Sequence, residues 1–174
     1  MVKALFLDRD GTINVDYGYV FQREKFKFID GVIELCRAPH RSRSHRLLRL
    51  LLEPVAGRRA EEKGYLIIVI TNQSGIARGY YSDADFQEIT RYMTMKFADS
   101  GVHITDVFYC PDLDGNRRKP NAGMFLEARD KYDIDMQNSI SVGDKPRDIE
   151  AGKAAGVGKN FLFETNFNEV MEAL

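Results

Sequence analysis

The chain has 174 residues and a formal net charge of −1, with 25 Lys and Arg against 26 Asp and Glu. This length suits one domain with a full core, and the near-neutral charge gives no general attraction for nucleic acid. Two cysteines are too few for a disulfide framework or for a site of four metal thiolates. The chain enters its first apolar segment without a signal-peptide pattern, and no apolar run is long enough to span a bilayer. We therefore expect a single cytoplasmic domain over residues 1–174.

An apolar run at residues 4–7 leads directly to two acidic residues, Asp8 and Asp10, and then to a glycine. Such a run predicts a strand buried on both faces of a parallel sheet. Ligands of these sheets bind beyond the carboxyl ends of the strands, where both acids would lie. Two carboxylates this close repel each other unless a cation neutralises them, and Mg²⁺ is the usual partner. An Asp can also act as a nucleophile and form an aspartyl-phosphate. On these residues alone, a solvated acidic turn is the alternative.

The segment Asp8-Arg9-Asp10-Gly11-Thr12 resembles the first motif of the haloacid-dehalogenase-like phosphatases, Asp-x-Asp-Gly-Thr after a hydrophobic strand. This resemblance implies that Asp8 is the nucleophile and Asp10 the general acid and base. It also implies that both bind Mg²⁺, Asp10 through its main-chain carbonyl. The next loop, residues 14–20, resembles the substrate loop of the heptose-bisphosphate phosphatases in this superfamily, although by itself it would be an ordinary surface turn. The implied substrate contacts are Asp16, Tyr17, Gly18 and Tyr19.

A short helix is predicted after Asp30, which suits an N-cap, with apolar residues at helical spacing through Cys36. From Pro39 to Arg59 the composition changes: six Arg and one Glu give this segment +5, so the rest of the chain carries −6. Within it, residues 44–53 have the pattern of a basic amphipathic helix, which can contact a membrane surface or an anionic partner. The alternatives are a surface excursion and a foreign insertion. We favour a surface excursion in the first crossover, without a catalytic part.

A second buried strand, rich in β-branched residues, is predicted at residues 65–70. It delivers a hydroxyl and amide cluster to the same edge as Asp8, where such groups can hydrogen-bond phosphate oxygens. As an isolated run this cluster would be weak evidence, but its order after the acidic strand strengthens it. The run from Thr71 to Gly79 resembles the heptose-bisphosphate branch. The implied substrate contacts are Thr71, Asn72, Gln73 and Ser74.

A helix is predicted to begin at Ser82, with Asp85 at the N3 position of a capping box. An apolar stripe at spacings of three or four follows and indicates a face packed on the core. The stripe consists of Phe86, Ile89, Met93 and Phe97.

A third strand is predicted at residues 106–110. Heptose-bisphosphate relatives continue from the corresponding cysteine into a zinc loop, but this chain has only Cys110 there, and one thiol cannot build a tetrahedral zinc site. We expect no zinc and a loop ordered by its own turn around Asp114-Gly115. Two adjacent cations follow, which are commonly a solvated rim. The resemblance instead implies that Lys119 faces the transferred phosphate and that Arg118 holds a second substrate phosphate.

A helix is predicted at residues 122–131, a fourth strand at 139–142, a fifth at 160–163 and a last helix from Asn166. The fourth strand ends in Gly143-Asp144-Lys145, with Asp148 four residues after Asp144. A glycine lets the backbone turn tightly and places Asp144 beside the first carboxylates as a further metal ligand. The motif resembles the fourth one of the superfamily, which implies a supporting role for Asp148 and a phosphate-facing one for Lys145.

Five strands that alternate with helices predict an α/β fold, a three-layer α/β/α sandwich with a parallel five-stranded sheet. The resemblance covers the chain apart from residues 39–59 and the missing zinc loop, and it implies Rossmann-like strand order without a large cap domain. It further implies a monomeric, Mg²⁺-dependent phosphatase of a small phosphorylated sugar, removing the 7-phosphate of a heptose 1,7-bisphosphate, with no nucleic-acid or membrane partner.

Two alternatives stay open. A histidinol-phosphate phosphatase is the nearest other enzyme. A non-catalytic anion- or membrane-binding protein built around the basic segment is a hypothesis of another class, and the presence of Asp8, Asp10, Asp144 and Lys119 together argues against it.

We predict that joining Ala38 to Ala60 leaves an active phosphatase. The crossover that residues 39–59 interrupt belongs on a face of the sheet, whereas the catalytic groups gather at the carboxyl edge, and loop insertions cost little closure entropy. The expected kcat/KM lies within about tenfold of the parent, which corresponds to 1.4 kcal/mol in transition-state binding. A shortened chain that folds but has no activity would show that the segment reaches the site.

Overall fold

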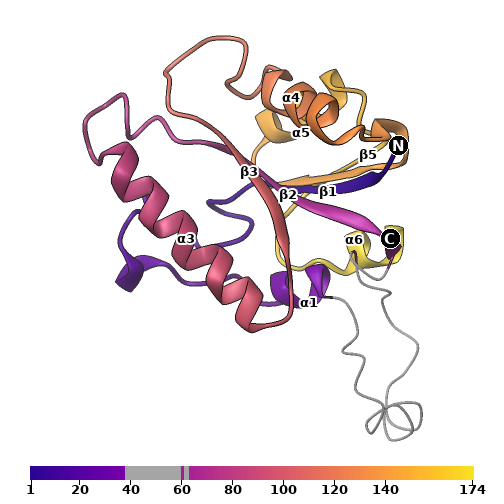
Figure 1. Cartoon of the computed structure of the whole chain (residues 1–174), viewed down its shortest axis with the longest axis horizontal. Helices are drawn as coiled ribbons and strands as arrows, with labels where there is room; N and C mark the ends of the chain where they lie inside the picture. The colour runs from indigo at the N-terminus through magenta and orange to yellow at the C-terminus, as the bar shows by residue number, and fades with distance from the viewer. Residues whose placement is uncertain (38–59, 61–62) are drawn as a thin grey trace, which may run out of the picture.

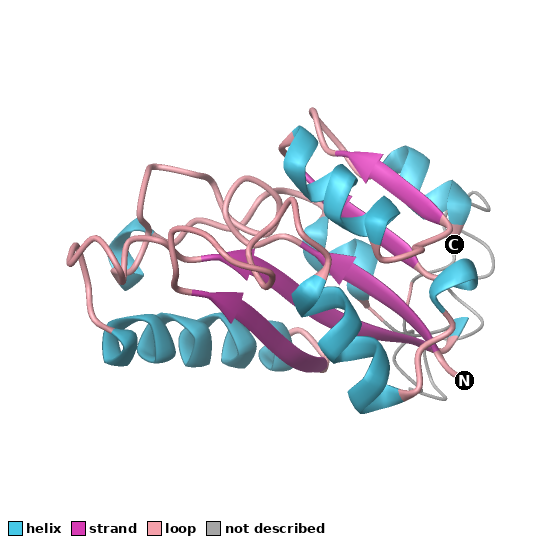
Figure 2. Cartoon of the chain, turned by 90° about the horizontal axis from the view of Figure 1, so that it is seen from above, coloured by secondary structure: helices cyan, strands magenta, loops and turns pink. Residues whose placement is uncertain are grey.

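The computed structural model describes residues 1–37, 60 and 63–174, in which a parallel five-stranded sheet lies between two layers of helices (Figures 1 and 2). The strands follow the order β3-β2-β1-β4-β5, so the predicted α/β/α sandwich is confirmed. Their bounds are β1 Lys3–Leu7, β2 Tyr65–Asn72, β3 Ile104–Cys110, β4 Ile140–Gly143 and β5 Lys159–Leu162. The described α-helices are α1 Val32–Cys36, α3 Asp83–Asp99, α4 Gly123–Tyr132, α5 Pro146–Ala154 and α6 Asn168–Ala173, and the 3₁₀ turns are η1 Arg23–Lys25 and η3 Met136–Asn138.

Strand β1 is the centre of the sheet and sends alternate side chains to the two helical layers. Leu5 and Leu7 belong to the core on one face, and Ala4 and Phe6 to the core on the other. All four residues are at most 1% exposed, as expected for a strand covered on both sides. Leu7 pairs with a residue of β2 and one of β4, so the carboxyl ends of three adjacent strands meet at one edge.

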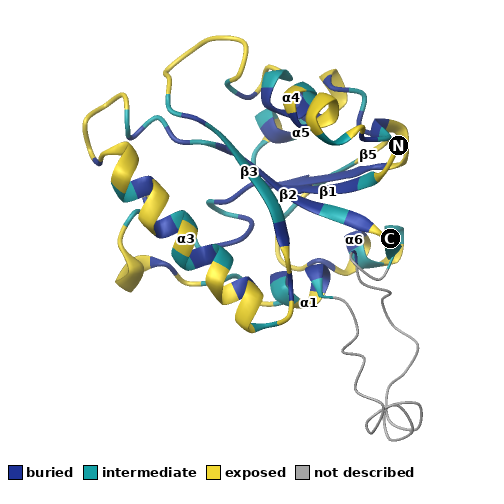
Figure 3. Cartoon of the chain, viewed as in Figure 1, coloured by how far each residue is buried: buried dark blue, intermediate teal, exposed yellow. Residues whose placement is uncertain are grey.

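The helices divide between the two faces of this sheet. Helices α4 and α5 lie on one face, and α1, α3 and α6 lie on the other (Figure 1). Their inner sides are buried and their outer sides are exposed (Figure 3). The apolar stripe predicted on α3 is confirmed, because each of its four members is at most 1% exposed. None of the described helices has both the length and the apolar character needed to cross a membrane.

Two expectations about the chain before β2 have different outcomes. Asp30 as an N-cap is wrong, because Gly31 takes the cap position of α1 with φ 87° and no side-chain cap bond, so the helix begins one residue later. A glycine suits this left-handed backbone, which strains residues that carry a Cβ. The expected basic helix at residues 44–53 and the excursion at 39–59 lie outside the described residues and stay predictions.

The start of α3 agrees with its predicted capping box. The Ser82 hydroxyl accepts a hydrogen bond from the Asp85 N–H at 3.2 Å, and the Asp85 carboxylate accepts one from the Ser82 N–H at 2.8 Å. These bonds satisfy two donors that a helix start would otherwise leave without intrahelical partners.

We predict that Ser82→Ala destabilises the protein by about 1 kcal/mol while kcat stays at the parent value. The substitution removes the N-cap acceptor but no group of the carboxyl edge of the sheet. Urea unfolding monitored by circular dichroism measures the change. Ser100→Ala, at the other end of α3, is the matched control because Ser100 caps through its backbone N–H. Equal stability of Ser82→Ala and the parent would contradict the prediction.

Candidate active site

Asp8 follows β1 directly and is held at the carboxyl edge of the sheet. Its backbone N–H donates to the carbonyl of Val142 at 2.9 Å, which continues the pairing of β1 with β4. Its Oδ1 accepts a hydrogen bond from Lys119 Nζ at 2.7 Å, and the residue is 7% exposed. Asp8, the predicted nucleophile, therefore lies beside Lys119, the cation that was expected at the same site.

Lys119 is a buried cation with partners on several elements. Its Nζ donates to the carbonyl of Ile70 at 2.7 Å and lies 2.7 Å from the carboxylate of Asp148 on α5. The side-chain amide of Asn72 exchanges two 3.0 Å hydrogen bonds with the backbone N–H and carbonyl of Lys119. Asn72, predicted as a substrate contact, thus also fixes the backbone that carries the lysine.

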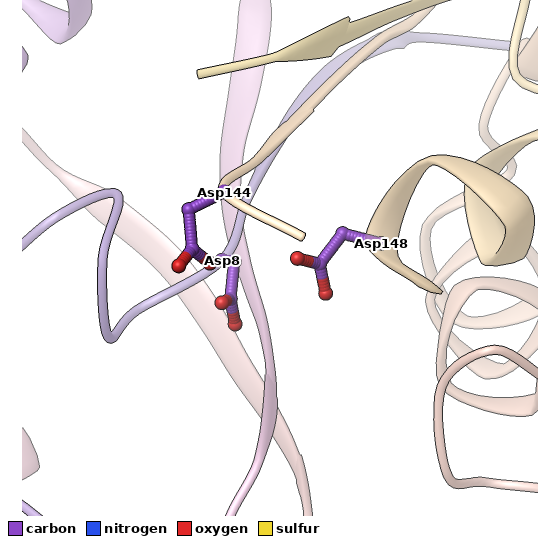
Figure 4. Close-up of side chains that lie close together, drawn as sticks. All are labelled: Asp8, Asp144 and Asp148. Atoms are coloured by element: carbon purple, nitrogen blue, oxygen red, sulfur yellow. The ribbon is translucent and has the colours of Figure 1, made fainter. Parts of the chain in front are cut away.

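Three carboxylates converge next to this lysine, from Asp8, Asp144 and Asp148 (Figure 4). One oxygen from each lies within 4.8 Å of the others. Burial and the negative charge of Asp8 raise the pKa of Asp144 to about 6, against the opposing charge of Lys145. Asp144 Oδ1 is buried without a hydrogen-bond partner. A buried acceptor in an excess of negative charge suits a hard divalent cation, so these residues fit Mg²⁺.

The carboxylate cluster differs in part from the predicted metal ligands Asp8, Asp10 and Asp144, and these ligands stay a prediction. Asp148 joins the carboxylate cluster, but it already faces Lys119 and accepts a 2.9 Å bond from the Lys145 N–H. These contacts fit the supporting role expected for it. The carboxylate of Asp10 accepts hydrogen bonds from other side chains and is not part of the carboxylate cluster. The metal contact expected of Asp10 is through its main-chain carbonyl.

Four donors from three residues surround the Asp10 carboxylate. Arg9 Nη2 and Nε donate at 2.9 and 3.1 Å, and Asn14 Nδ2 and Gln73 Nε2 each donate at 3.0 Å. Arg9 itself is fully buried, and its Nη2 also donates to the carbonyl of Val20 at 2.7 Å. Arg9 was not among the predicted site residues, because in the sequence a cation between two acids resembles a solvated turn.

Thr71, at the carboxyl end of β2, is 1% exposed and is linked to the Asp10 carboxylate through the side-chain amide of Gln73. Gln73 Nε2 donates to Thr71 Oγ1 at 2.9 Å as well as to Asp10. The side-chain oxygen of Gln73, Oε1, accepts a 2.5 Å hydrogen bond from the hydroxyl of Tyr81. Tyr81 was not among the predicted site residues. Burial raises the pKa of Tyr81 to about 12, and the charge of Arg9 opposes this shift.

The loop after Asp10 contacts the loop after β4 through one ion pair. Lys145 Nζ lies 3.0 Å from Asp16 and 3.4 Å from Asp144. Burial alone would raise the pKa of Asp16, but the bonds from Lys145 and from the Gly18 N–H lower it below its usual value. Lys145 therefore connects the predicted substrate loop with the metal-binding edge.

These groups surround a cavity of about 330 Å³ at the carboxyl edge. Of the predicted site residues, Tyr17 is 60% exposed and lies outside its lining, and Asp144 reaches the site through the carboxylate cluster. The cavity also includes Arg78, Tyr81 and Arg147, which were not predicted. The predicted residues that line it are Asp8, Asp10, Asp16, Gly18, Tyr19, Thr71, Asn72, Gln73, Ser74, Arg118, Lys119 and Lys145.

The segment from Cys110 to α4, where relatives were expected to carry zinc, is held by hydrogen bonds. The carbonyl of Gly115 accepts from the Arg118 N–H at 3.1 Å and from Asn121 Nδ2 at 3.0 Å. Arg118 Nη1 donates to the Asp112 carbonyl at 3.0 Å. These bonds agree with a loop ordered by its own turn, while the absence of zinc stays a prediction.

The chain matches a known protein family and several named relatives. The model of the family described as polynucleotide kinase 3 phosphatase matches residues 47–164. The chain is 45% identical over 161 residues to D-glycero-alpha-D-manno-heptose-1,7-bisphosphate 7-phosphatase of Campylobacter jejuni, which covers 92% of this chain and 81% of the relative. It is 43% identical over 172 residues to D-glycero-beta-D-manno-heptose-1,7-bisphosphate 7-phosphatase of Vibrio cholerae, and the match covers 93% of this chain and 81% of the relative.

A solved structure agrees with these relatives. The D,D-heptose 1,7-bisphosphate phosphatase of B. bronchiseptica, complexed with magnesium and phosphate, superposes with a TM-score of 0.73 at 27% identity. The match covers 98% of this chain and 86% of that one. With its acidic strand end, buried lysine and sheet order, the chain belongs to the heptose-1,7-bisphosphate 7-phosphatase family of haloacid-dehalogenase-like phosphatases.

Proposed function

We propose that this protein is a Mg²⁺-dependent phosphatase that removes the 7-phosphate of a heptose 1,7-bisphosphate. The observation that carries the proposal is the buried contact between Asp8 and Lys119, with the Asp10 carboxylate held separately by Arg9, Asn14 and Gln73. A nucleophile, a fixed cation and a second carboxylate are the groups that phosphoryl transfer through an aspartyl-phosphate requires. The names of the similar proteins supply the substrate class.

Asp8, the main-chain carbonyl of Asp10 and Asp144 would hold Mg²⁺, which when bound neutralises charge on the substrate phosphate. The fit is supported by the unpartnered Asp144 Oδ1 and by the position of Gly11. A Cβ built on Gly11 would lie 2.2 Å from Asp144 Oδ2, and Gly11 has φ 89°. Only glycine therefore lets the turn after β1 approach the end of β4 this closely.

The reaction then proceeds in two displacements on Asp8. The Asp8 carboxylate attacks phosphorus in line, the bond between phosphorus and the sugar oxygen breaks, and Asp10 gives its proton to the leaving alkoxide. Asp10 next takes a proton from water, which attacks the aspartyl-phosphate and releases inorganic phosphate and free Asp8. Thr71 and Lys119 stabilise the phosphoryl oxygens through both displacements.

The second phosphate of the substrate would bind at the cationic side of the cavity. Arg118 and Lys145 line it together with the newly found Arg78 and Arg147. A guanidinium forms bidentate bonds to phosphate oxygens, and a lysine adds a point charge. Four cations in addition to Lys119 in one cavity suit a substrate with an anionic group at each end better than a monophosphate.

We also propose that the enzyme works as a monomer in the cytoplasm, without nucleic-acid or membrane partners. The net charge of −1 gives no general attraction for polyanions such as nucleic acid. A panel of both heptose-bisphosphate anomers and histidinol phosphate, assayed for phosphate release with Mg²⁺, tests the function. A preference for histidinol phosphate would overturn the substrate assignment.

We predict that Asp8→Asn lowers kcat at least a hundredfold and leaves the fold intact, because an amide of nearly equal volume is a poor nucleophile. Asp10→Asn should still form the phospho-enzyme but turn it over slowly. Phosphate release and acid-quench detection of phospho-enzyme measure the two effects, with circular dichroism as the check of folding. Retention of more than about a hundredth of the activity by Asp8→Asn would contradict the covalent mechanism, because general acid–base catalysis alone supplies 10²–10⁴-fold.

We predict that Arg118→Ala lowers kcat/KM for heptose bisphosphate by about 10- to 100-fold, since a hydrogen bond to a charged group contributes 1.5–3 kcal/mol. The loss for an aryl phosphate, which lacks the second phosphate, should be much smaller. Arg117→Ala is the matched control, because Arg117 pairs with the exposed Glu127 at 2.7 Å and does not line the cavity. Equal losses on the two substrates would remove Arg118 from the second phosphate.

A further inference from the structure

Tyr81 belongs to the loop between β2 and α3, residues 73–82, and its position is fixed by packing. Its ring stacks on Phe21 with centroids 5.1 Å apart, and the residue is 6% exposed. On another side lies Gly75, where an added Cβ would be 2.1 Å from the ring. An aromatic ring confined in this way can hold its hydroxyl in one place without an ordering cost at the moment of reaction.

The hydroxyl of Tyr81 directs the amide of Gln73. Its 2.5 Å bond to Gln73 Oε1 lies on the opposite end of the amide from Asp10. The orientation of the amide follows from these bonds: Gln73 Nε2 donates to Asp10, and Gln73 Oε1 accepts from the tyrosine. With burial raising the pKa of Tyr81 to about 12, the phenol keeps its proton and acts as the donor.

The same amide sets the direction of the Thr71 hydroxyl. Thr71 Oγ1 accepts from Gln73 Nε2 at 2.9 Å, and a hydroxyl has a single proton of its own. The proton of Thr71 is therefore left to donate to a phosphoryl oxygen. A chain of donors thus runs from Tyr81 through Gln73 to both Thr71 and Asp10, and each of these four residues except Asp10 is at most 6% exposed.

We infer that Tyr81 is a positioning residue, which acts through Gln73 to fix the acid–base carboxylate of Asp10 and the phosphate-binding hydroxyl of Thr71 relative to each other. This inference rests on the proposed function and names a further residue of that site. Tyr81 touches neither substrate nor reacting atoms in this role. The alternative is that its hydroxyl only satisfies a buried carbonyl, with an effect on stability alone.

The test compares Tyr81→Phe with the parent on two leaving groups. A sugar alkoxide needs a proton from Asp10 as it leaves, whereas 4-nitrophenolate leaves without one. In single-turnover experiments, Tyr81→Phe should slow phosphorylation about tenfold with heptose bisphosphate and less than threefold with 4-nitrophenyl phosphate. Hydrolysis of the phospho-enzyme, which uses Asp10 as the base, should be slowed equally whichever substrate formed it.

Tyr109→Phe is the matched control. It also removes one phenolic hydroxyl with hydrogen-bonded partners, since Tyr109 donates to Asp83 at 2.6 Å and accepts from Gln87 at 3.2 Å, but it does not line the cavity. Its rates should equal those of the parent on both substrates. Thermal unfolding of both variants separates a change in stability from a change in rate.

A double-mutant cycle tests whether Tyr81 acts through Gln73. Once Gln73→Ala has removed the amide, adding Tyr81→Phe should cost no further activity, because the path to Asp10 is already broken. Should Tyr81→Phe fail to fold, Gln73→Glu tests the next link of the chain, since it keeps the acceptor for Tyr81 and removes the donor to Asp10; parent rates in Gln73→Glu would overturn the inference.

Two results would overturn the inference: parent rates in Tyr81→Phe on both substrates, or equal slowing of phosphorylation with both. Additive losses in the cycle would show that Tyr81 acts by another route. These outcomes are separate from failure of the proposed function, which would appear as an Asp8→Asn variant that retains activity.

Discussion

The Lys119 ammonium, with Asp8, Asp148 and the carbonyl of Ile70 each 2.7 Å from it, connects the ends of β1 and β2 with the start of α5. Loss of the cation would leave two buried carboxylates facing each other, and removing one partner of a buried ion pair typically costs about 3–5 kcal/mol. The architecture of the site edge and the charge balance of the proposed chemistry therefore depend on one side chain. Asn72 supports this side chain by binding both the backbone N–H and the backbone carbonyl of Lys119.

A second buried cation, Arg9, does for Asp10 what Lys119 does for Asp8. The two carboxylates follow the same strand with one residue between them, but their charges are compensated by different cations. In the proposed mechanism, this separation leaves Asp8 to act as the nucleophile, whereas Asp10 is held by directional donors. Two chemically identical side chains thus have different surroundings, on which their different proposed roles depend.

Much of the fold could be predicted because the hydrophobic pattern of each strand is a local property of the chain, while the strand order in the sheet was implied by the family resemblance. The runs that became β1 and β2 are continuous and apolar, and the polar residues that follow them had to meet at one edge once the strands were parallel. The site residues Asp8, Thr71 and Asp144 were accessible by this reasoning, and the family motifs supplied their roles.

Other residues depend on tertiary contacts that no local pattern contains. The burial of Arg9 depends on the Val20 carbonyl, eleven positions away, which accepts a hydrogen bond from its guanidinium. Tyr81 belongs to the site because Gly75 and Phe21 leave space for its ring. Gln73 was expected to contact substrate, yet its amide is 2% exposed and bound to other side chains of the site. The sequence signal that could have indicated Tyr81 is its position two residues after Gly79, the last residue of the 71–79 run.

The cationic side of the cavity has a consequence for the way a substrate arrives. Arg78 is exposed, and Arg118, Lys145 and Arg147 are only partly covered, so their field extends into solvent. Positive charges at the opening of the cavity raise the encounter rate of a small anionic substrate at low ionic strength. At physiological salt the Debye length is about 8 Å, comparable with the size of a sugar bisphosphate. Capture would therefore slow as salt rises, while the displacements at the buried Asp8 and Lys119 would be screened far less.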